Sequence, residues 1–368
     1  TGVFQHTVDF DPGAGTTEFT SAGARDLFVS KLDSSGDLVW ARSFGGTGGD
    51  MAWSVAVDSS GNVHTTGHFS DTVDFDPGAG TTNLTSNGSY DVFVSKLDSS
   101  GDLVWAKSFG GTDRGTGYSV AVDSSGNVYT TGYFVGTADF DPGAGTVELS
   151  AVVGALGGDV FVSKLDSSGN YVWAKSFGGT RQDVGNSVAV DSSGNVYTTG
   201  FFQGTADFDP GAGTTNLTTT GPEVGDDVFV SKLDSAGDLL WVKGFGGAEY
   251  SFYGPDDRGY SVALDSSGNV YITGQFLGTV DFDPGAGTTE FTSADAVWPY
   301  GTDVFVSRLD STGNLGTAVP AGFTLSTTTV SVAETGTTAQ FTVVLDAEPV
   351  SDVVIWSASS DSGEAQVG

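Results

Sequence analysis

The heptapeptide Asp-Phe-Asp-Pro-Gly-Ala-Gly occurs five times without a change along this chain of 368 residues. The copies begin at residues 9, 74, 139, 207 and 281, so that successive copies lie 65, 65, 68 and 74 residues apart. Repeats of this kind are typical of propellers, solenoids and arrays, in which each unit buries its apolar face against its neighbours. The heptapeptide therefore restricts the chain to a repetitive architecture.

Two hairpins with alternating apolar residues recur within each unit. The first joins Phe28–Asp33 to Leu38–Phe44, and the second joins Ser54–Asp58 to Asn62–Gly67. The first returns at residues 93, 161 and 229, and in truncated form at 305; the second returns at residues 119, 187 and 261. Period-two alternation predicts strands. Four strands per unit, joined by hairpins, predict the blade of a β-propeller.

Nine turns of the form Asp-Ser-(Ser/Ala/Thr)-Gly-(Asp/Asn) connect the strands of these hairpins. The pattern predicts a type I turn followed by a left-handed glycine, with the leading aspartate accepting backbone N–H groups. We therefore interpret these aspartates as structural and not as metal ligands.

The expected fold is all-β, with a propeller of four-stranded blades over residues 1–316. Four blades are complete between residues 26 and 276, and a fifth has only its first strand and turn at 305–315. Joining the strand at Thr1–Phe4 to this last unit would close a ring of about five blades, the last one composite or incomplete. A linker at 317–322 precedes a partial β-sandwich at 323–368, whose three expected strands leave open sheet edges and indicate a piece of a longer chain.

Charge limits the partners of this chain. The chain contains 13 Lys and Arg and 46 Asp and Glu, which gives a formal net charge of -33. This excess argues against nucleic acids and anionic membranes and in favour of cations. The absence of cysteine excludes disulfides and thiolate metal sites. The chain also has no run of about 18 apolar residues, so a membrane-spanning helix is not predicted.

The heptapeptide itself is the candidate cation site. In an extended segment its two carboxylates share a face, and at about 7 Å they repel by roughly 2 kcal/mol at an effective dielectric constant near 20. Calcium accepts six to eight oxygen ligands in irregular geometry. The alternative is that the aspartates only cap the turn. The predicted Ca²⁺ ligands are Asp9, Asp11, Asp74, Asp76, Asp139, Asp141, Asp207, Asp209, Asp281 and Asp283.

Two further residue types recur once per unit. One aspartate precedes the first strand, and we interpret it as a cap on the strand entry; the series is Asp26, Asp91, Asp159, Asp227 and Asp303. One tryptophan lies in the first hairpin, and we interpret it as packing between blades and not as a sugar platform; the series is Trp40, Trp105, Trp173 and Trp241.

Catalytic motifs are lacking. His6, His64 and His68 have no counterparts in the other units, and Tyr129, Tyr197 and Tyr271 replace His64, which favours a strand residue. The acids are shared equally by all units, whereas a glycosidase would need one asymmetric site. We therefore expect no enzymatic activity.

Two long loops break the symmetry of the repeats. The loop at 248–260 has 13 residues, and the loop at 288–302 is also the longest of its series. Aromatic residues on such loops are candidates for contact with a ligand, here Tyr250, Phe252, Tyr253 and Trp298.

The repeats resemble a known family. The segments at 91–111 and 118–132 are similar to the bacterial SBBP-type β-propeller repeat, a resemblance that covers roughly residues 1–315. It implies a large secreted or surface-attached protein without implying a single activity. Residues 330–346 are similar to the opening strands of Calx-β domains, which implies an extracellular calcium-associated sandwich with Glu334 and Asp346 as candidate ligands.

Taken together, these features predict a non-enzymatic, calcium-stabilised structural or adhesive module on the outside of a bacterial cell. We expect it to associate with itself, through its open C-terminal sheet, or with other surface proteins, in a layer, matrix or fibre. The alternative is a carbohydrate-binding module of a secreted protein, with a polysaccharide bound at the aromatic loops.

Overall fold

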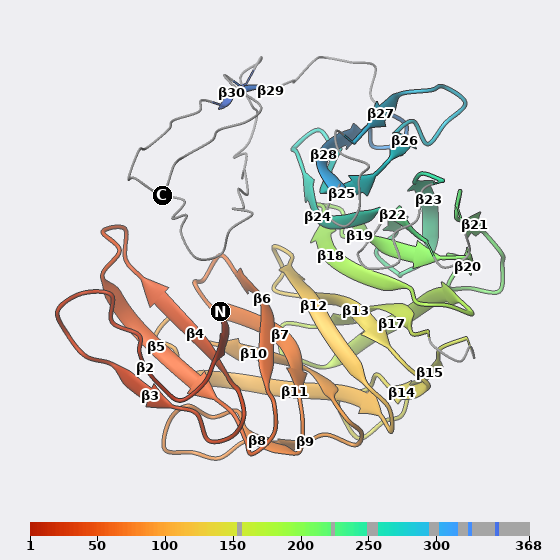
Figure 1. The fold of residues 1–368 in the computed structure, drawn as a ribbon. Helices are drawn as coiled ribbons and strands as arrows, with labels where there is room; N and C mark the ends of the chain where they lie inside the picture. Colours follow the sequence, from red (N-terminus) through yellow and green to blue (C-terminus); the bar gives the residue numbers. More distant parts are fainter. Residues whose placement is uncertain are drawn as a thin grey trace.

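The computed structural model describes residues 1–152, 157–221, 225–248, 257–293 and 302–315, together with the backbone of two short strands at 323–325 and 343–345. The described residues form strands and turns, without a helix. The expected all-β fold is confirmed. Five antiparallel sheets follow one another along the chain, from the red sheet at lower left to the blue-green sheet at upper right in Figure 1.

The first and last sheets have three strands, and the three between them have four main strands each. The first contains β1 (Gly2–Phe4), β4 (Asp26–Leu32) and β5 (Leu38–Phe44). The second contains β6 (Met51–Val57), β7 (Val63–Phe69), β10 (Asp91–Leu97) and β11 (Leu103–Gly111). The third contains β12 (Gly115–Val122), β13 (Val128–Phe134), β16 (Asp159–Leu165) and β17 (Tyr171–Gly179). The fourth contains β18 (Val184–Val190), β19 (Val196–Gln203), β22 (Asp226–Leu233) and β23 (Leu239–Phe245), and the fifth β24 (Arg258–Leu264), β25 (Val270–Leu277) and β28 (Thr302–Leu309).

Five short hairpins, one for each heptapeptide, complete the repeats. They are β2 (Thr7–Asp9) with β3 (Glu18–Thr20), β8 (Thr72–Asp74) with β9 (Asn83–Thr85), β14 (Thr137–Asp139) with β15 (Glu148–Ser150), β20 (Thr205–Asp207) with β21 (Asn216–Thr218), and β26 (Thr279–Asp281) with β27 (Glu290–Thr292). Near the C-terminus β29 (Phe323–Leu325) pairs with β30 (Val343–Leu345); the rest of the expected sandwich lies outside the described residues.

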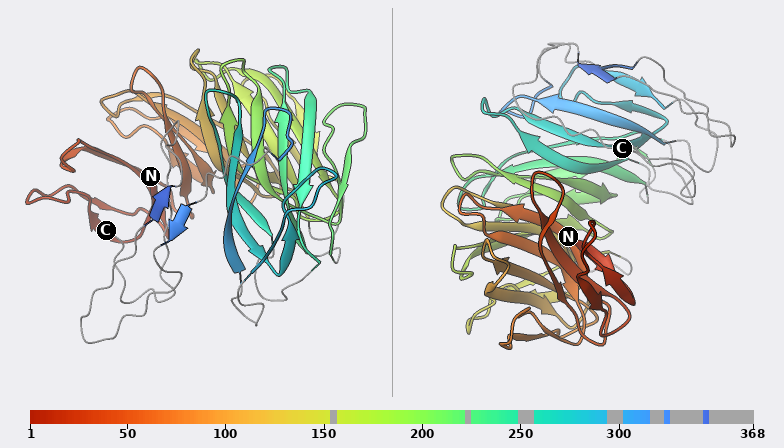
Figure 2. Two further views of the ribbon diagram at one scale, coloured as in Figure 1. Left: turned by 90° about the horizontal axis from the view of Figure 1, so that it is seen from above. Right: turned by 90° about the vertical axis from the view of Figure 1, so that its left-hand side faces the viewer.

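The composition of the sheets corrects the expected blades. Each sheet combines the second hairpin of one unit with the first hairpin of the next, as β7 pairs with β10 and β13 with β16. Three sheets are therefore complete, where four complete blades were expected. The composite blade does not form among the described residues, because β1 pairs with β4 and β28 pairs with β25. Figure 2 shows the first and last sheets at opposite ends of the series.

The inner edge of the series is formed by β6, β12, β18 and β24. A serine hydroxyl on each strand accepts a backbone N–H from the next: Ser54 from Val120, Ser119 from Val188, and Ser187 from Val262. Between successive sheets lie four apolar clusters, each with residues from both sheets. The core of the molecule is therefore divided among the junctions between sheets.

The turns have the predicted geometry. The glycine of all nine Asp-Ser-x-Gly turns has a positive φ, for example 79° at Gly126. The leading aspartate accepts two backbone N–H groups, as Asp123 does from Ser125 and Asn127 at 2.9 Å each. These aspartates cap their turns, which confirms the structural interpretation.

Candidate functional site

The heptapeptide hairpins lie at the junctions between sheets. The hairpin β2–β3 is inserted between β1 and β4 of the first sheet, and the other four are inserted between the second and third strands of their own sheets. These four also pair with the outer strand of the preceding sheet or with the residue or two that follow it. The pairs are Gly110↔Asp139 and Gly111↔Ala138, Gly178↔Asp207 and Gly179↔Ala206, Gly45↔Asp74, and Gly247↔Val280. We call these four, β8–β9, β14–β15, β20–β21 and β26–β27, the latch hairpins.

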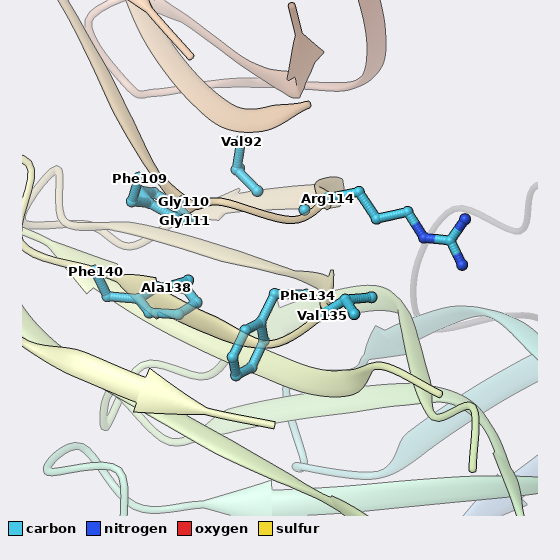
Figure 3. Close-up of a pocket in the computed structure, with 10 residues that line it drawn as sticks. Val92, Phe109, Gly110, Gly111, Arg114, Phe134, Val135, Ala138 and Phe140 are labelled. Carbon is cyan, nitrogen blue, oxygen red and sulfur yellow. The ribbon is translucent and has the colours of Figure 1, made fainter. Parts of the chain in front are cut away.

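The phenylalanine of each latch hairpin fills the junction. Phe140 is 1% exposed, and its ring centroid lies 5.2 Å from those of Phe109 in the preceding sheet and of Phe134 in its own (Figure 3). The ring of Phe161, also in its own sheet, lies at the same distance. The crevice around it has no room for a water molecule. Phe75, Phe208 and Phe282 are buried in the same way. The phenylalanine of the heptapeptide thus belongs to the core at each of these four junctions.

The first aspartate of each heptapeptide organises the loop. Oδ1 of Asp139 accepts the backbone N–H of Asp141 at 3.0 Å and of Val147 at 2.8 Å. The same two bonds occur in the other four copies, at Asp9, Asp74, Asp207 and Asp281. Capping lowers the pKa of Asp9, because ionised carboxylates are the better acceptors.

The second aspartate is enclosed by the glycines that follow it. Oδ1 of Asp141 accepts the N–H of Gly143 at 2.8 Å, and a Cβ on Gly145 would overlap the same carboxylate. The Pro-Gly-Ala-Gly sequence thus folds around this side chain. Within the described residues no group of three or more His, Cys, Asp or Glu is placed to hold a metal ion. Calcium binding by the ten heptapeptide aspartates stays a prediction, and would need backbone or water oxygens as further ligands.

Four of the five aspartates that precede the first strand are buried at the same junctions, and Asp303 is half-buried. Asp26, Asp91, Asp159 and Asp227 are at most 5% exposed. Oδ2 of Asp159 accepts the N–H of Val152 at 3.0 Å, which agrees with the predicted cap. Oδ1 of Asp26, Asp91 and Asp159 is buried without a hydrogen-bond partner in the structure. Burial raises the pKa of Asp159 to about 7.

A second buried aspartate accompanies this cap where the first and second, the third and fourth, and the fourth and fifth sheets meet. At the last of these junctions Asp257 accepts the N–H groups of Gly247 and Leu277. Asp183 is fully buried and accepts the N–H groups of Gly179 and Gln203. A Cβ on Gly178 would lie 2.7 Å from Oδ1 of Asp159 and 2.8 Å from Oδ2 of Asp183, so the two carboxyl groups converge there. Burial, and secondarily the charge of Asp159, raises the pKa of Asp183 well above its usual value. Asp50 occupies the corresponding position beside Asp26. The sequence analysis missed these pairs, because Asp50 and Asp183 lie in loops of varying sequence.

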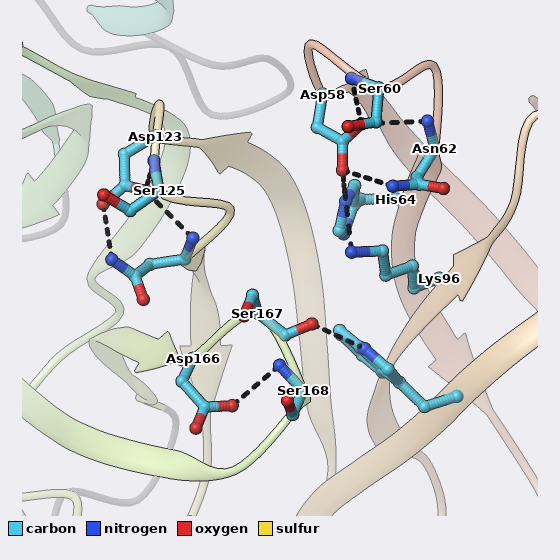
Figure 4. A network of polar contacts seen from close by, with 12 residues as sticks. Asp58, Ser60, Asn62, His64, Lys96, Asp123, Ser125, Asp166, Ser167 and Ser168 are labelled. Carbon is cyan, nitrogen blue, oxygen red and sulfur yellow. Dashed lines mark hydrogen bonds and ion pairs between the residues drawn. The ribbon is translucent and has the colours of Figure 1, made fainter.

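A polar pocket of about 200 Å³ lies where the turns of the second and third sheets meet (Figure 4). Asp58, Asp123, Lys96 and Ser167 contribute to its walls. Asp58 is already engaged by Asn62, by His64 at 3.4 Å and by Lys96 at 3.6 Å. Desolvation alone would raise the pKa of Asp58, but hydrogen bonds from Asn62, Ser60 and His64 hold it far below the usual value. The carboxylates of this pocket therefore serve the turns that form it.

The recurrent tryptophans join neighbouring sheets, which confirms their predicted packing role. The indole N–H of Trp105 donates to the carbonyl of Ser167 in a turn of the next sheet, at 3.2 Å. Trp40, Trp173 and Trp241 make the equivalent bonds. His64 is a fully buried residue of β7, which confirms its assignment to a strand.

Exposed aromatic residues at the inner edge form a second surface that the sequence analysis missed. Trp53 on β6 and Tyr260 on β24 are 50% and 46% exposed. The ring of Trp53 lies 5.5 Å from that of Tyr118 on β12, which lies 5.9 Å from that of Tyr133. The signal in the sequence was Trp53 itself, because it lies outside the recurrent tryptophan series. The predicted ligand contacts Tyr250, Phe252, Tyr253 and Trp298, and the predicted calcium ligands Glu334 and Asp346, lie outside the described residues.

Comparison with known proteins identifies the repeat. The family model described as SBBP, beta-propeller repeat, matches residues 104–133, 172–200 and 240–275. Each match runs from the outer strand of one sheet into the first two strands of the next, as β11, β12 and β13 do. Three segments of the chain therefore match this β-propeller repeat, which agrees with the resemblance seen in the sequence.

Two curated proteins are similar over most of the repeat region. An uncharacterised WD repeat-containing protein of Acanthamoeba polyphaga mimivirus is 26% identical over 62% of this chain. Regulatory protein FlaEY of Caulobacter vibrioides is 29% identical over 67% of this chain. The matched regions span only 18% and 24% of those relatives. A crystal structure of a protein of unknown function from Bacteroides caccae matches 78% of this chain and 91% of its own, at 10% identity and a TM-score of 0.29. Within the described residues no helix is long and apolar enough to cross a membrane.

Proposed function

We propose that this β-propeller repeat protein is a non-enzymatic structural and adhesive module of the bacterial cell surface or extracellular space. The observation that carries the proposal is the latch. Four successive junctions are joined by backbone pairing and by a buried phenylalanine from the next repeat. Such a scaffold resists separation of its sheets, and its acids recur in every repeat instead of forming one asymmetric catalytic site.

Calcium is the proposed stabilising ion. In each of the four latch loops two half-buried carboxylates lie within one turn, and the backbone N–H groups of the loop donate to Oδ1 of each, as at Asp139 and Asp141. Neutralising these pairs would also reduce the repulsion that accompanies a net charge of -33. Calcium bound at the loops would therefore strengthen the latches and allow acidic modules to approach one another, by self-association or on other surface proteins.

Calorimetric titration of Ca²⁺ into chelator-treated protein tests the role of calcium. We expect more than one ion per chain and a rise in melting temperature. Asp141→Asn should remove one site, whereas Asp166→Asn, in an Asp-Ser-Ser-Gly turn that we assign no metal, should leave the stoichiometry unchanged. Absence of binding together with an unchanged melting temperature would exclude calcium stabilisation.

The second candidate function is carbohydrate binding. The observation that favours it is the exposed aromatic surface at the inner edge, where Trp53 and Tyr118 meet. This surface differs from the long loops to which the sequence directed attention.

A further inference from the structure

Each inner strand carries a β-bulge at the same position. The pairing of β6 with β7 shifts between Ala52 and Ser54, which leaves Trp53 as the extra residue. The corresponding extra residues are Tyr118 in β12, Asn186 in β18 and Tyr260 in β24. A bulge frees one residue from the ladder and redirects its side chain. The repeat therefore presents one variable side chain per sheet along the inner edge.

Aromatic rings gather where the bulges of the second and third sheets meet. The Trp53 ring lies 5.5 Å from Tyr118 and 6.3 Å from His68, and His68 lies 4.8 Å from Tyr90. Tyr118 in turn stacks on Tyr133. We call these five residues the aromatic surface. Trp53 and Tyr90 are 50% and 39% exposed, so the surface offers ring area to solvent.

The fold does not require aromatic residues at these positions. In the fourth sheet the bulge holds Asn186, whose amide donates to the carbonyl of Gly259 at 2.8 Å. The inner strands there keep the same serine-mediated contact to the next sheet, from Val262 to Ser187. Half-exposed aromatic rings forgo much of the free energy that their burial would supply. Their presence points to a ligand.

His68 and Tyr118 of this surface are uncharged near neutral pH. Burial lowers the pKa of His68 to about 4, and its Nδ1 lies 3.3 Å from the donating indole N–H of Trp53. Burial, with Tyr133 nearby, raises the pKa of Tyr118 to about 12, so its hydroxyl keeps its proton. The guanidinium of Arg114 lies over the Tyr133 ring at 6.0 Å. The surface thus combines apolar ring faces with the neutral hydrogen-bonding groups of His68 and Tyr118, and two cations, Arg114 and Arg258, lie close enough to oppose the rise in the pKa of Tyr118.

This chemistry selects among classes of ligand. Nucleic acids stack on aromatic rings only along a positively charged groove, and this chain carries -33. A stable protein interface needs about 20 to 30 residues from each partner, far more than this surface provides. A sugar ring has an apolar C–H face and neutral hydroxyl groups, which match the rings and the polar tips. We propose that the aromatic surface binds a neutral polysaccharide, which gives the module a ligand independently of calcium.

The test uses the whole chain and soluble neutral glycans as probes: laminarin, xylan, mannan, cellohexaose and chitohexaose. Binding is measured by calorimetry and by affinity electrophoresis, with circular dichroism as the check on folding. We expect at least one probe to bind, and we expect Trp53→Ala and Tyr118→Ala each to weaken it by 10-fold or more. Val39→Ala is the matched control, because Val39 is equally exposed, at 51%, on an outer strand.

Salt and pH separate this site from an electrostatic one. The dissociation constant of a neutral glycan should vary by less than about 2-fold between pH 6 and 9 and between 20 and 300 mM NaCl, because salt screens charged contacts and not uncharged ones. Failure of every probe to bind, or binding unaffected by Trp53→Ala and Tyr118→Ala in folded protein, would overturn the proposal. Binding restricted to an acidic glycan such as polygalacturonate, weakened by salt, would also overturn it. None of these results depends on calcium or bears on the latch.

Discussion

At the scale of single residues, Phe140 shows how much of a junction depends on one side chain. Its ring contacts phenylalanines of both adjoining sheets and is 1% exposed. Phe140→Ala should lower the free energy of unfolding by about 3–5 kcal/mol, from lost burial and the cavity left behind. Urea denaturation measures the change. Phe10→Ala is the matched control, since Phe10 holds the same heptapeptide position but is only partly buried and should cost less.

The buried carboxyl of Asp159 makes stability depend on pH. Its pKa is raised by burial from 3.8 to about 7, so between these values the folded protein binds a proton that the unfolded chain has released. Stability then falls as pH rises through this window. Asp159→Asn should flatten that slope and be the more stable protein at pH 8, by about 2 kcal/mol or more. Chemical denaturation at pH 4, 6 and 8 measures this.

Asp91→Asn is the control for the acid pair. Asp91 is a buried cap of the same series, with its pKa raised by burial, whereas the charge of Asp159 in addition raises the pKa of its neighbour Asp183. Asp91→Asn should therefore change the pH dependence of stability less than Asp159→Asn does. Equal pH profiles for the two variants would show that convergence with Asp183 has no energetic effect.

At the scale of elements, the latch hairpin is the part that joins sheets. Replacing residues 137–150 with a short Gly-Ser turn removes the backbone pairing of β14 with Gly110 and Gly111. Amide exchange of β11 near these glycines should accelerate by roughly 10-fold or more, because their junction opens locally. Hydrogen exchange by mass spectrometry measures it. The same replacement of residues 7–20 should leave β11 unchanged, since β2–β3 pairs only with itself among the described strands.

The sequence predicted the local elements well, because each is encoded within a few residues. Alternation located the two hairpins, and the Asp-Ser-x-Gly pattern located the turns with their capping aspartates. It did not predict which hairpins share a sheet. Strand β7 is equally apolar whether it pairs forward with β10 or closes a blade within its own unit, so the choice is made by non-local packing. For the same reason, the burial of Asp183 and the exposure of Trp53 on its bulge could not be predicted from the alternation of apolar residues.

At the scale of the molecule, two opposing effects act on the series of sheets. The latch of each sheet holds the sheet before it, whereas the chain has 46 acidic and only 13 basic residues, so its excess carboxylates repel one another. Monovalent salt screens this repulsion over a Debye length of about 8 Å at physiological ionic strength, whereas a bound divalent ion removes charge at its site. The two effects therefore have different concentration dependences.

Calcium-driven assembly is the prediction that follows. At constant ionic strength, millimolar Ca²⁺ should raise the weight-average sedimentation coefficient as protein concentration increases, because neutralised loops on neighbouring chains no longer repel. Mg²⁺ is the matched ion, since it has the same charge but demands a tighter octahedral site and dehydrates reluctantly. Equal effects of the two ions would indicate non-specific neutralisation. A monomer at every protein and calcium concentration would exclude assembly, while leaving calcium binding to a single chain open to the calorimetric test.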